Sequence, residues 1–196
     1  MGKIFCLMGK SSSGKDTIYR ELFKRSDISL KKIIPYTTRP IREGEEEGRE
    51  YYFCNEDQVT QLQNADKIVE LRTYDTVYGV WKYFTVDDGQ VDLEDNSYLL
   101  IGTLETYRKI RQYYGAAHVV PVYIEVEDGE RLLRAIAREK EQMIPKYTEM
   151  CRRFLADSED FSEEKLKEAG VSVRFENEKL ENTIDKVAAY IRQQVC

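Results

Sequence analysis

The chain has 196 residues, of which 41% are hydrophobic, and a formal net charge of −6. This length and apolar content suit one compact domain, while the negative charge argues against a nucleic-acid polymer as partner, because such binding needs a basic surface. No segment reaches the roughly 20 apolar residues that cross a bilayer, and the four scattered cysteines form no C-x-x-C pair, so we expect a cytoplasmic protein with reduced thiols and no membrane contact.

Apolar runs that suit buried strands alternate along the chain with amphipathic runs that suit helices. Near-continuous apolar strands separated by helices predict an α/β fold, with a parallel sheet covered on both faces and ligands at the carboxyl ends of its strands. The expected strands are 3–8, 32–35, 97–101, 118–126 and 171–175, and the expected helices are 15–25, 104–114, 128–141 and 179–195.

Residues 36–82 interrupt this alternation. They are rich in Tyr, Arg, Glu and Gly, and they predict an inserted lobe of short strands. A helix at 56–65 in this lobe is expected to be capped by Asn55, because an Asn side chain can accept from the first backbone N–H groups of a helix. The short strands are expected at 51–53, 68–73 and 77–81.

A second charged insertion contains Pro145 and predicts a mobile helical lid at residues 138–156. The remaining residues are expected to form the core of a single domain. In this division the core consists of residues 1–35, 83–137 and 157–196.

The first expected strand runs into the glycine-bounded loop Gly9-Lys-Ser-Ser-Ser-Gly14-Lys15-Asp16-Thr17. The loop fits the phosphate-binding pattern G-x-x-x-x-G-K-[ST] up to its last position, where Asp16 replaces the hydroxyl residue that normally contacts magnesium. In such a loop, backbone N–H groups and the positive end of the following helix converge on phosphate oxygens. The alternative is a plain glycine-serine turn between a strand and a surface helix. The residues expected to bind a nucleoside triphosphate are Gly9, Ser11, Ser12, Ser13, Gly14, Lys15, Asp16 and Thr17.

The lobe carries the most specific pattern of the chain, Tyr36-Thr-Thr-Arg39-Pro-Ile-Arg42-Glu-Gly44-Glu45-Glu-Glu-Gly48-Arg-Glu-Tyr51-Tyr-Phe53. This segment resembles the nucleoside-monophosphate-binding signature of guanylate kinases, and the resemblance extends over essentially the whole chain. It implies a P-loop NTPase three-layer fold with a central parallel sheet, an inserted nucleoside-monophosphate-binding lobe and a helical lid. It also implies transfer of the γ-phosphate of ATP to GMP or dGMP, with Mg²⁺ as cofactor.

The resemblance assigns Arg39, Arg42, Tyr51 and Tyr78 to the phosphate of the acceptor GMP. Planar guanidinium forks and phenolic donors are well suited to grip a monophosphate dianion. The alternative is that the two arginines form salt bridges in a solvated loop and that the tyrosines pack in the core of the lobe.

Glu70 is assigned to the guanine base by the same resemblance. Guanine presents adjacent N1–H and N2–H donors, which one carboxylate can accept together, whereas adenine offers no such pair. The alternative is an ordinary strand glutamate that faces water.

The resemblance further names Arg138 and Arg152 as lid arginines that act beside Lys15 in catalysis, because phosphoryl transfer needs alignment and charge neutralisation. It places Asn177 in the region that contacts the adenine of ATP. Surface salt bridges are the alternative for the two arginines, and a turn position is the alternative for Asn177.

Three positions depart from the guanylate kinase pattern. Pro35 replaces a serine that helps to read guanine, and Ile101 and Thr103 replace two aspartates, one associated with the base and one with the magnesium region. Thr103 is the polar group that remains there for GMP. We expect Asp16 to orient the magnesium ion instead, since Mg²⁺ uses one or two carboxylates and keeps several waters. The alternative is an acid that only stabilises a helix N-terminus.

Two other functions stay open at the level of sequence. The P-loop with its aspartate also resembles that of ribose 1,5-bisphosphate kinases, which lack the tyrosine-rich end of the acceptor signature. A catalytically inactive guanylate-kinase-like binding module is the other possibility, but such modules usually have an eroded P-loop, whereas Gly9, Gly14 and Lys15 are present here. The sequence therefore favours a guanylate kinase.

Overall fold

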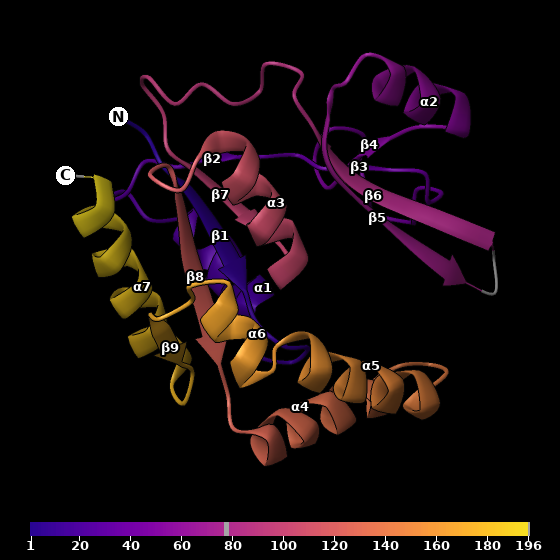
Figure 1. Cartoon of the computed structure of the whole chain (residues 1–196). Helices are drawn as coiled ribbons and strands as arrows, with labels where there is room; N and C mark the ends of the chain where they lie inside the picture. Colours follow the sequence, from indigo (N-terminus) through magenta and orange to yellow (C-terminus); the bar gives the residue numbers. More distant parts are fainter. Residues whose placement is uncertain (77–78, 196) are drawn as a thin grey trace.

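The computed structural model describes residues 1–76 and 79–195 of the chain (Figure 1). Its centre is a five-stranded sheet in the order β2-β7-β1-β8-β9, in which all neighbouring strands are parallel. The α/β fold with a parallel sheet that the sequence predicts is therefore confirmed. The strands are β1 (Ile4–Met8), β2 (Lys31–Lys32), β7 (Tyr98–Ile101), β8 (Val119–Glu125) and β9 (Arg174–Glu176).

Hydrophobic clusters on both faces of this sheet give the core three layers. Successive side chains of β1 point to opposite faces, and all five are completely buried, as expected for the central strand of a covered parallel sheet. One face packs against α3 and α6, and the other packs against α1 and α7. These helices are α1 (Lys15–Leu22), α3 (Leu104–Tyr114), α6 (Glu163–Glu168) and α7 (Leu180–Val195).

A second sheet of four strands, in the order β4-β3-β6-β5, projects from the core at the upper right of Figure 1. Val59 of helix α2 packs against Phe84 and Val86 on one face of this sheet. Asn55 caps α2 as expected, because its side chain accepts from the Gln58 N–H at 2.9 Å and the Gln58 side chain accepts from the Asn55 N–H at 2.9 Å. The elements are β3 (Tyr36–Thr37), β4 (Tyr52–Phe53), α2 (Glu56–Asn64), β5 (Ile68–Thr76) and β6 (Gly79–Val86).

Helices α4 (Asp128–Lys140) and α5 (Tyr147–Asp160) pack against each other and project from the core at the bottom of Figure 1. The expected lid at 138–156 covers only the end of α4 and most of α5. Similarly, β6 continues the second sheet to Val86, beyond the expected lobe boundary at 82. No helix among residues 1–76 and 79–195 combines the length and the apolar character needed to cross a membrane.

Two expected strands are wrong in position. The expected strand at 32–35 is only Lys31–Lys32, because Pro35 has no N–H to donate to a neighbouring strand. The expected strand at 171–175 begins only at Arg174, because Gly170, with φ +73°, ends α6 in a turn in which the Val171 N–H donates to the Leu166 carbonyl. The expected strand at 77–81 falls partly on residues outside those described, and β6 begins at Gly79.

Candidate active site

The loop after β1 turns directly into α1, as the P-loop pattern predicts. Gly14 is the N-cap of α1 with φ +86°, and the Thr17 and Ile18 N–H groups donate to its carbonyl oxygen. A Cβ atom at Gly14 would lie 2.5 Å from Nδ2 of Asn177, so both the conformation and the space require glycine. The loop therefore directs the N-terminal, positive end of α1 toward the edge of the sheet where β1 ends.

Asn177 fixes the inner side of this loop. Its Nδ2 donates to the Ser13 carbonyl oxygen at 2.8 Å, and its own carbonyl accepts from Arg134 at 3.1 Å. Asn177 is buried, and its Oδ1 has no hydrogen-bond partner among the described residues. The Oγ atoms of Ser12 and Ser13 are also buried and without a partner within the described part of the chain. The loop thus holds buried polar atoms that a polar ligand could satisfy.

Lys15 and Asp16 lie in the first turn of α1. The Nζ of Lys15 is 3.6 Å from Oδ2 of Asp16, and the side chains are 18% and 74% exposed. The next residue, Thr17, accepts a long 3.5 Å hydrogen bond from Arg20. The structure therefore presents one cation and one carboxylate at the helix end that faces the loop.

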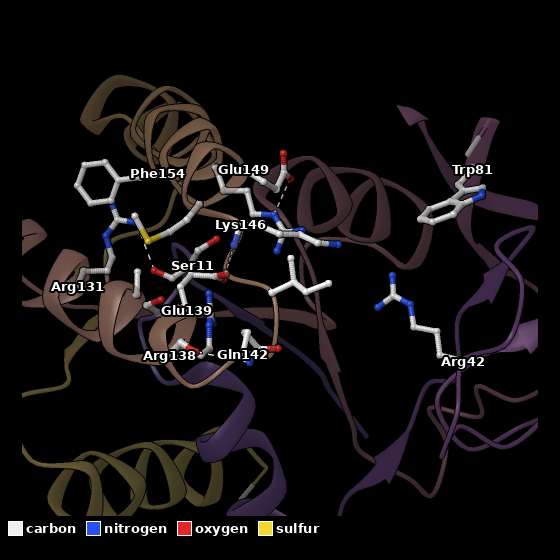
Figure 2. Close-up of a pocket in the computed structure, with 15 residues that line it drawn as sticks. Ser11, Arg42, Trp81, Arg131, Arg138, Glu139, Gln142, Lys146, Glu149 and Phe154 are labelled. Carbon is white, nitrogen blue, oxygen red and sulfur yellow. Dashed lines mark hydrogen bonds and ion pairs between the residues drawn. The ribbon is translucent and has the colours of Figure 1, made fainter. Parts of the chain in front are cut away.

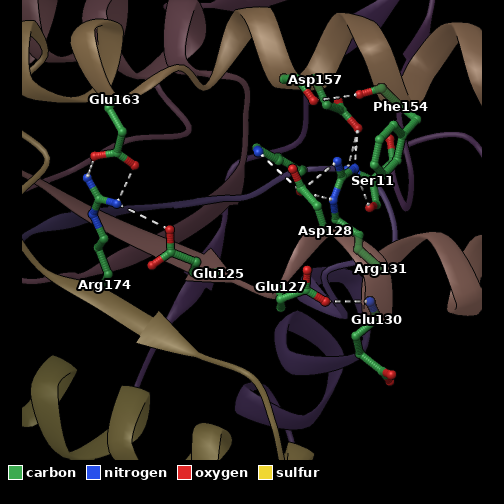
Figure 3. Close-up of polar contacts among 12 residues, drawn as sticks. Ser11, Glu125, Glu127, Asp128, Glu130, Arg131, Phe154, Asp157, Glu163 and Arg174 are labelled. Atoms are coloured by element: carbon green, nitrogen blue, oxygen red, sulfur yellow. Dashed lines mark hydrogen bonds and ion pairs between the residues drawn. The ribbon is translucent and has the colours of Figure 1, made fainter.

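An ion-pair network connects the loop to α4 and α5 (Figure 3). The buried Arg131 guanidinium donates to the Ser11 carbonyl and to Oδ2 of Asp157, both at 3.3 Å, and it pairs with Asp128 at 3.0 Å. Asp157 Oδ2 also accepts from the Ser11 backbone N–H at 2.7 Å. Phe154 covers the guanidinium, with its ring centroid 4.1 Å from Arg131 Cζ. Both helices are thereby tied to the P-loop.

A cavity of about 450 Å³ lies between this loop, the two helices and the four-stranded sheet (Figure 2). The loop contributes Ser11 and Ser12, and the sheet side contributes Arg42 and Trp81. Two carboxylates, Glu139 and Glu149, line the cavity, and more cationic side chains than carboxylates do so. The cationic residues are Arg42, Arg131, Arg138, Lys146 and Arg153. The cavity therefore favours a strongly anionic ligand.

Arg152 is not among the residues that line this cavity in the described chain. It forms two hydrogen bonds with Glu149, both at 2.8 Å, and its side chain is 64% exposed. Hydrogen bonds from Arg152 and Arg153 lower the pKa of Glu149 to about 2. Adjacent residues on a helix point about 100° apart, so a shift of one residue selects a different face. Arg153, the next residue along α5, lines the cavity, and the role given to Arg152 stays a prediction.

The residues expected to bind the acceptor phosphate lie on the sheet side. Arg39 is only 3% exposed, and its NH1 and NH2 donate to the two carboxylate oxygens of Glu45 at 2.9 and 2.8 Å. Its Cζ lies 5.3 Å from the ring centroid of the half-buried Tyr51. Arg42 is exposed and lines the cavity. The expected partner Tyr78 lies outside the described residues.

Glu70 does not face water, so the alternative of an ordinary strand glutamate on the surface is wrong. Its side chain is 0% exposed, and its carboxylate accepts from Thr85 Oγ1 at 3.0 Å and from Arg72 Nε at 3.1 Å. Thr103 is the N-cap of α3, where its Oγ1 accepts from the Thr106 N–H at 3.2 Å. Thr103 thus has a structural role that the sequence did not predict.

Arg72, Arg131 and Asp157 were not predicted from the sequence. Their interactions join segments that are distant along the chain, such as Asp157 and Ser11, and no local pattern marks such pairs. The spacing of Asp128 and Arg131, three residues apart on a helix, was the one available signal for Arg131.

Comparisons with known proteins identify relatives over nearly the whole chain. The model of the family described as guanylate kinase matches residues 1–194. A guanylate kinase of Anaplasma phagocytophilum is 25% identical over 99% of this chain and 88% of its own length. A guanylate kinase of Bradyrhizobium diazoefficiens is 31% identical over 74% of this chain and 66% of its own length. The crystal structure of guanylate kinase from Anaplasma phagocytophilum has a TM-score of 0.70 at 21% identity, and the match covers 99% of this chain and 86% of that chain, which confirms the expected fold class.

Asn177→Ala is expected to destabilise the protein through the P-loop. The change leaves the buried Ser13 carbonyl without its side-chain partner, so we expect the free energy of unfolding to fall by about 1–3 kcal/mol. Chemical denaturation measures this quantity, and Asn182→Ala, an exposed position in α7, serves as the control. Equal stabilities of the two variants would contradict the role given to Asn177.

Proposed function

The chain belongs to the guanylate kinase family, and from this premise we propose that it transfers the γ-phosphate of ATP to GMP or dGMP to give ADP and the diphosphate. The family match also confirms the resemblance seen in the sequence and the expectation of a nucleotide-binding kinase, a transferase. The identities of the donor, the acceptor and the residues that bind them are the content of the proposal.

The observation that carries this proposal is the shared cavity. P-loop residues, arginines of α4 and α5, and Arg42 of the acceptor signature all line one space of about 450 Å³. A kinase that moves a phosphoryl group between two bound substrates needs its donor and acceptor sites to open into one another. The lining is rich in cations, as the high negative charge of two phosphorylated substrates requires.

On the donor side, the residues assigned to ATP are those of the P-loop. Backbone N–H groups of Gly9 to Gly14 and the Lys15 ammonium would hold the phosphates at the positive end of α1. Arg138 and Arg152, together with Arg153, which lines the cavity, would neutralise charge on the phosphoryl group as it moves. Asn177 supports this half by fixing the loop through Ser13.

On the acceptor side, Arg39, Arg42 and Tyr51 would hold the monophosphate, together with Tyr78. The guanidinium of Arg39 is already oriented, because it donates two hydrogen bonds to the two carboxylate oxygens of Glu45. Glu70, buried and hydrogen-bonded, would accept from the guanine N1–H and N2–H groups. Thr103, which caps α3, would lie beside the acceptor only as a neighbouring polar group.

The P-loop fits a magnesium ion that is held mainly by the substrate. Within the described residues no group of three or more His, Cys, Asp or Glu side chains is arranged to hold a metal. Mg²⁺ needs fewer protein ligands, because it keeps several waters and binds one or two carboxylates plus substrate phosphates. The exposed carboxylate of Asp16, beside Lys15, can supply that contact directly or through water. When bound, the ion would offset negative charge on the phosphates.

The acceptor is tested by following ADP release from Mg-ATP with GMP, dGMP, AMP, UMP, CMP and ribose 1,5-bisphosphate at matched protein concentration. We expect kcat/KM for GMP to exceed that for AMP by at least about tenfold, because Glu70 has a donor pair to accept only from guanine. Turnover with the sugar bisphosphate alone would replace the proposal with a ribose 1,5-bisphosphate kinase. No turnover with any acceptor would leave a binding protein.

Arg42→Ala is expected to raise the KM for GMP by about tenfold or more and to change the KM for ATP much less, because a charged hydrogen bond to phosphate is lost. Steady-state kinetics with each substrate varied in turn measures both constants. Arg49→Ala is the matched control, since Arg49 lies in the same loop and pairs with Glu46 and Glu50. Equal increases in both KM values would count against the assignment of Arg42 to the acceptor.

Asp16→Ala is expected to raise the Mg²⁺ concentration needed for half-maximal activity, by about tenfold, because one of the few carboxylates available to the ion is removed. Titration of activity with Mg²⁺ at fixed ATP measures the shift. Glu21→Ala, which removes a half-buried acid of the same helix that pairs with Lys24, is the control. An unchanged Mg²⁺ dependence would reduce Asp16 to an acid that only stabilises the helix end.

A further inference from the structure

Arg72 is a partly buried charge that the proposed function does not use. It follows Glu70 by two residues on β5, so both side chains point to the same face of the four-stranded sheet. Arg72 Nε donates to Glu70 Oε2 at 3.1 Å, and Thr85 Oγ1 donates to Oε1 at 3.0 Å. The side chain of Glu70 is 0% exposed and that of Arg72 is 17% exposed. In this ion pair, Glu70 is completely buried and only Arg72 is partly accessible from outside.

Arg72 also lies close to the residues proposed for the acceptor phosphate. Its cross-strand neighbour on β6 is Tyr83, whose ring contacts Tyr51 edge-on with centroids 5.7 Å apart. Burial raises the pKa of Tyr51, and the positive charges of Arg39 and Arg72 partly oppose that increase. Arg39 contacts Tyr51 directly, and Arg72 is connected to it through Tyr83. An acceptor whose phosphate lies at Arg39 and Tyr51 can extend its other end toward Arg72 and Glu70.

The charge of the pair indicates what kind of group it can bind. One carboxylate and one guanidinium sum to zero, so the pair offers little net attraction for a second phosphate. It suits a neutral ring that presents a hydrogen-bond acceptor next to donors. Each oxygen of Glu70 keeps a second lone pair beyond those used by Thr85 and Arg72. Arg72 has five N–H donors, of which Glu70 takes one and Tyr74 another.

We infer that Arg72 is a specificity-determining residue that donates a hydrogen bond to O6 of the guanine ring while Glu70 accepts from N1–H and N2–H. This inference rests on the proposed function. Guanine carries an acceptor at position 6 where adenine carries an amino donor, so a guanidinium at this place favours one base over the other. Pro35 offers neither a hydroxyl nor an N–H for that task. The feature of the base that Arg72 recognises is therefore the 6-oxo group of guanine.

The test compares GMP with 6-thio-GMP, which keeps N1–H and N2–H but has sulfur, a weaker acceptor, in place of O6. The wild-type chain is expected to prefer GMP in kcat/KM by about tenfold, the effect of one charged hydrogen bond. Arg72→Met, which has no donor, is expected to bring this ratio to about twofold or less while AMP turnover does not fall. The KM for ATP reports whether the variant is folded.

A second pair of variants protects the test against misfolding, because Arg72→Met alone leaves the Glu70 carboxylate buried with one partner. Glu70→Gln retains Arg72 and is expected to keep the preference for GMP over 6-thio-GMP, whereas Glu70→Gln combined with Arg72→Met is expected to lose it. Arg108→Met, which removes an exposed partner of Glu168, is the matched arginine control and is expected to keep the wild-type ratio.

The outcomes separate this inference from the proposed function. If the wild-type chain phosphorylates GMP but the ratio is the same with and without Arg72, the inference is wrong and the proposed function stands. If GMP and AMP lose turnover equally in Arg72→Met, Arg72 is structural and the inference is also wrong. If the wild-type chain phosphorylates no 6-oxopurine nucleotide, both the proposed function and the inference are wrong.

Discussion

Burial of β1 on both faces is the constraint on which the rest of the structure depends. Its five side chains are apolar and 0% exposed, so the strand lies at the centre of the sheet between β7 and β8. The P-loop and the positive end of α1 must then follow at its carboxyl end. Burial raises the pKa of Cys6 on this strand, and the negative charge of Glu70, which lies on β5, adds to the increase. The central strand therefore feels the charge of a residue proposed for the acceptor side.

Carboxylates of the protein form ion pairs with the poorly exposed arginines of the site and so stabilise their charge. A guanidinium removed from water loses hydration that only well-placed acceptors replace, and a protein with a net charge of −6 has such acceptors in excess. Each pair is preformed, so an incoming phosphate meets donors whose orientation is already set. The pairs with both side chains largely buried are Arg39 with Glu45, Arg72 with Glu70, and Arg131 with Asp157, whereas the second partner of Arg131, Asp128, is exposed.

Local sequence patterns were sufficient to predict an element wherever its structure depends only on residues of the same segment. The buried strand, the glycine-bounded loop and the cap at Asn55 were predicted because strand burial, positive φ angles and helix capping depend on residues close in sequence. The strand after α6 was displaced because a glycine turn took residues that the apolar pattern alone assigned to the strand. Here a specific backbone hydrogen bond, rather than hydrophobicity, determined the boundary.

The side chains that complete the site could not be predicted in the same way. Choosing between Arg152 and Arg153 requires the rotation of α5 against the core, which is set by packing and not by the two identical residue types. The resemblance leads to the expectation that Glu70 reads the base, but it does not lead to the ion pair with Arg72, which depends on the pleat of β5 and on the depth of burial. Sequence separation decides this difference, because contacts within an element are encoded locally and contacts between elements are not.

The contact between Asp157 and the Ser11 N–H has a consequence for how an anion can enter. The Asp157 carboxylate accepts a hydrogen bond from a loop N–H of the kind that binds phosphate. Arg131 donates both to this carboxylate and to the Ser11 carbonyl oxygen. A phosphate that approaches this N–H must compete with Asp157, since two like charges at one donor repel each other. Because Asp157 belongs to α5, the same competition acts on the helix that carries Arg153 into the cavity. Under the proposed function, one carboxylate would therefore connect occupation of the loop with the position of Arg153.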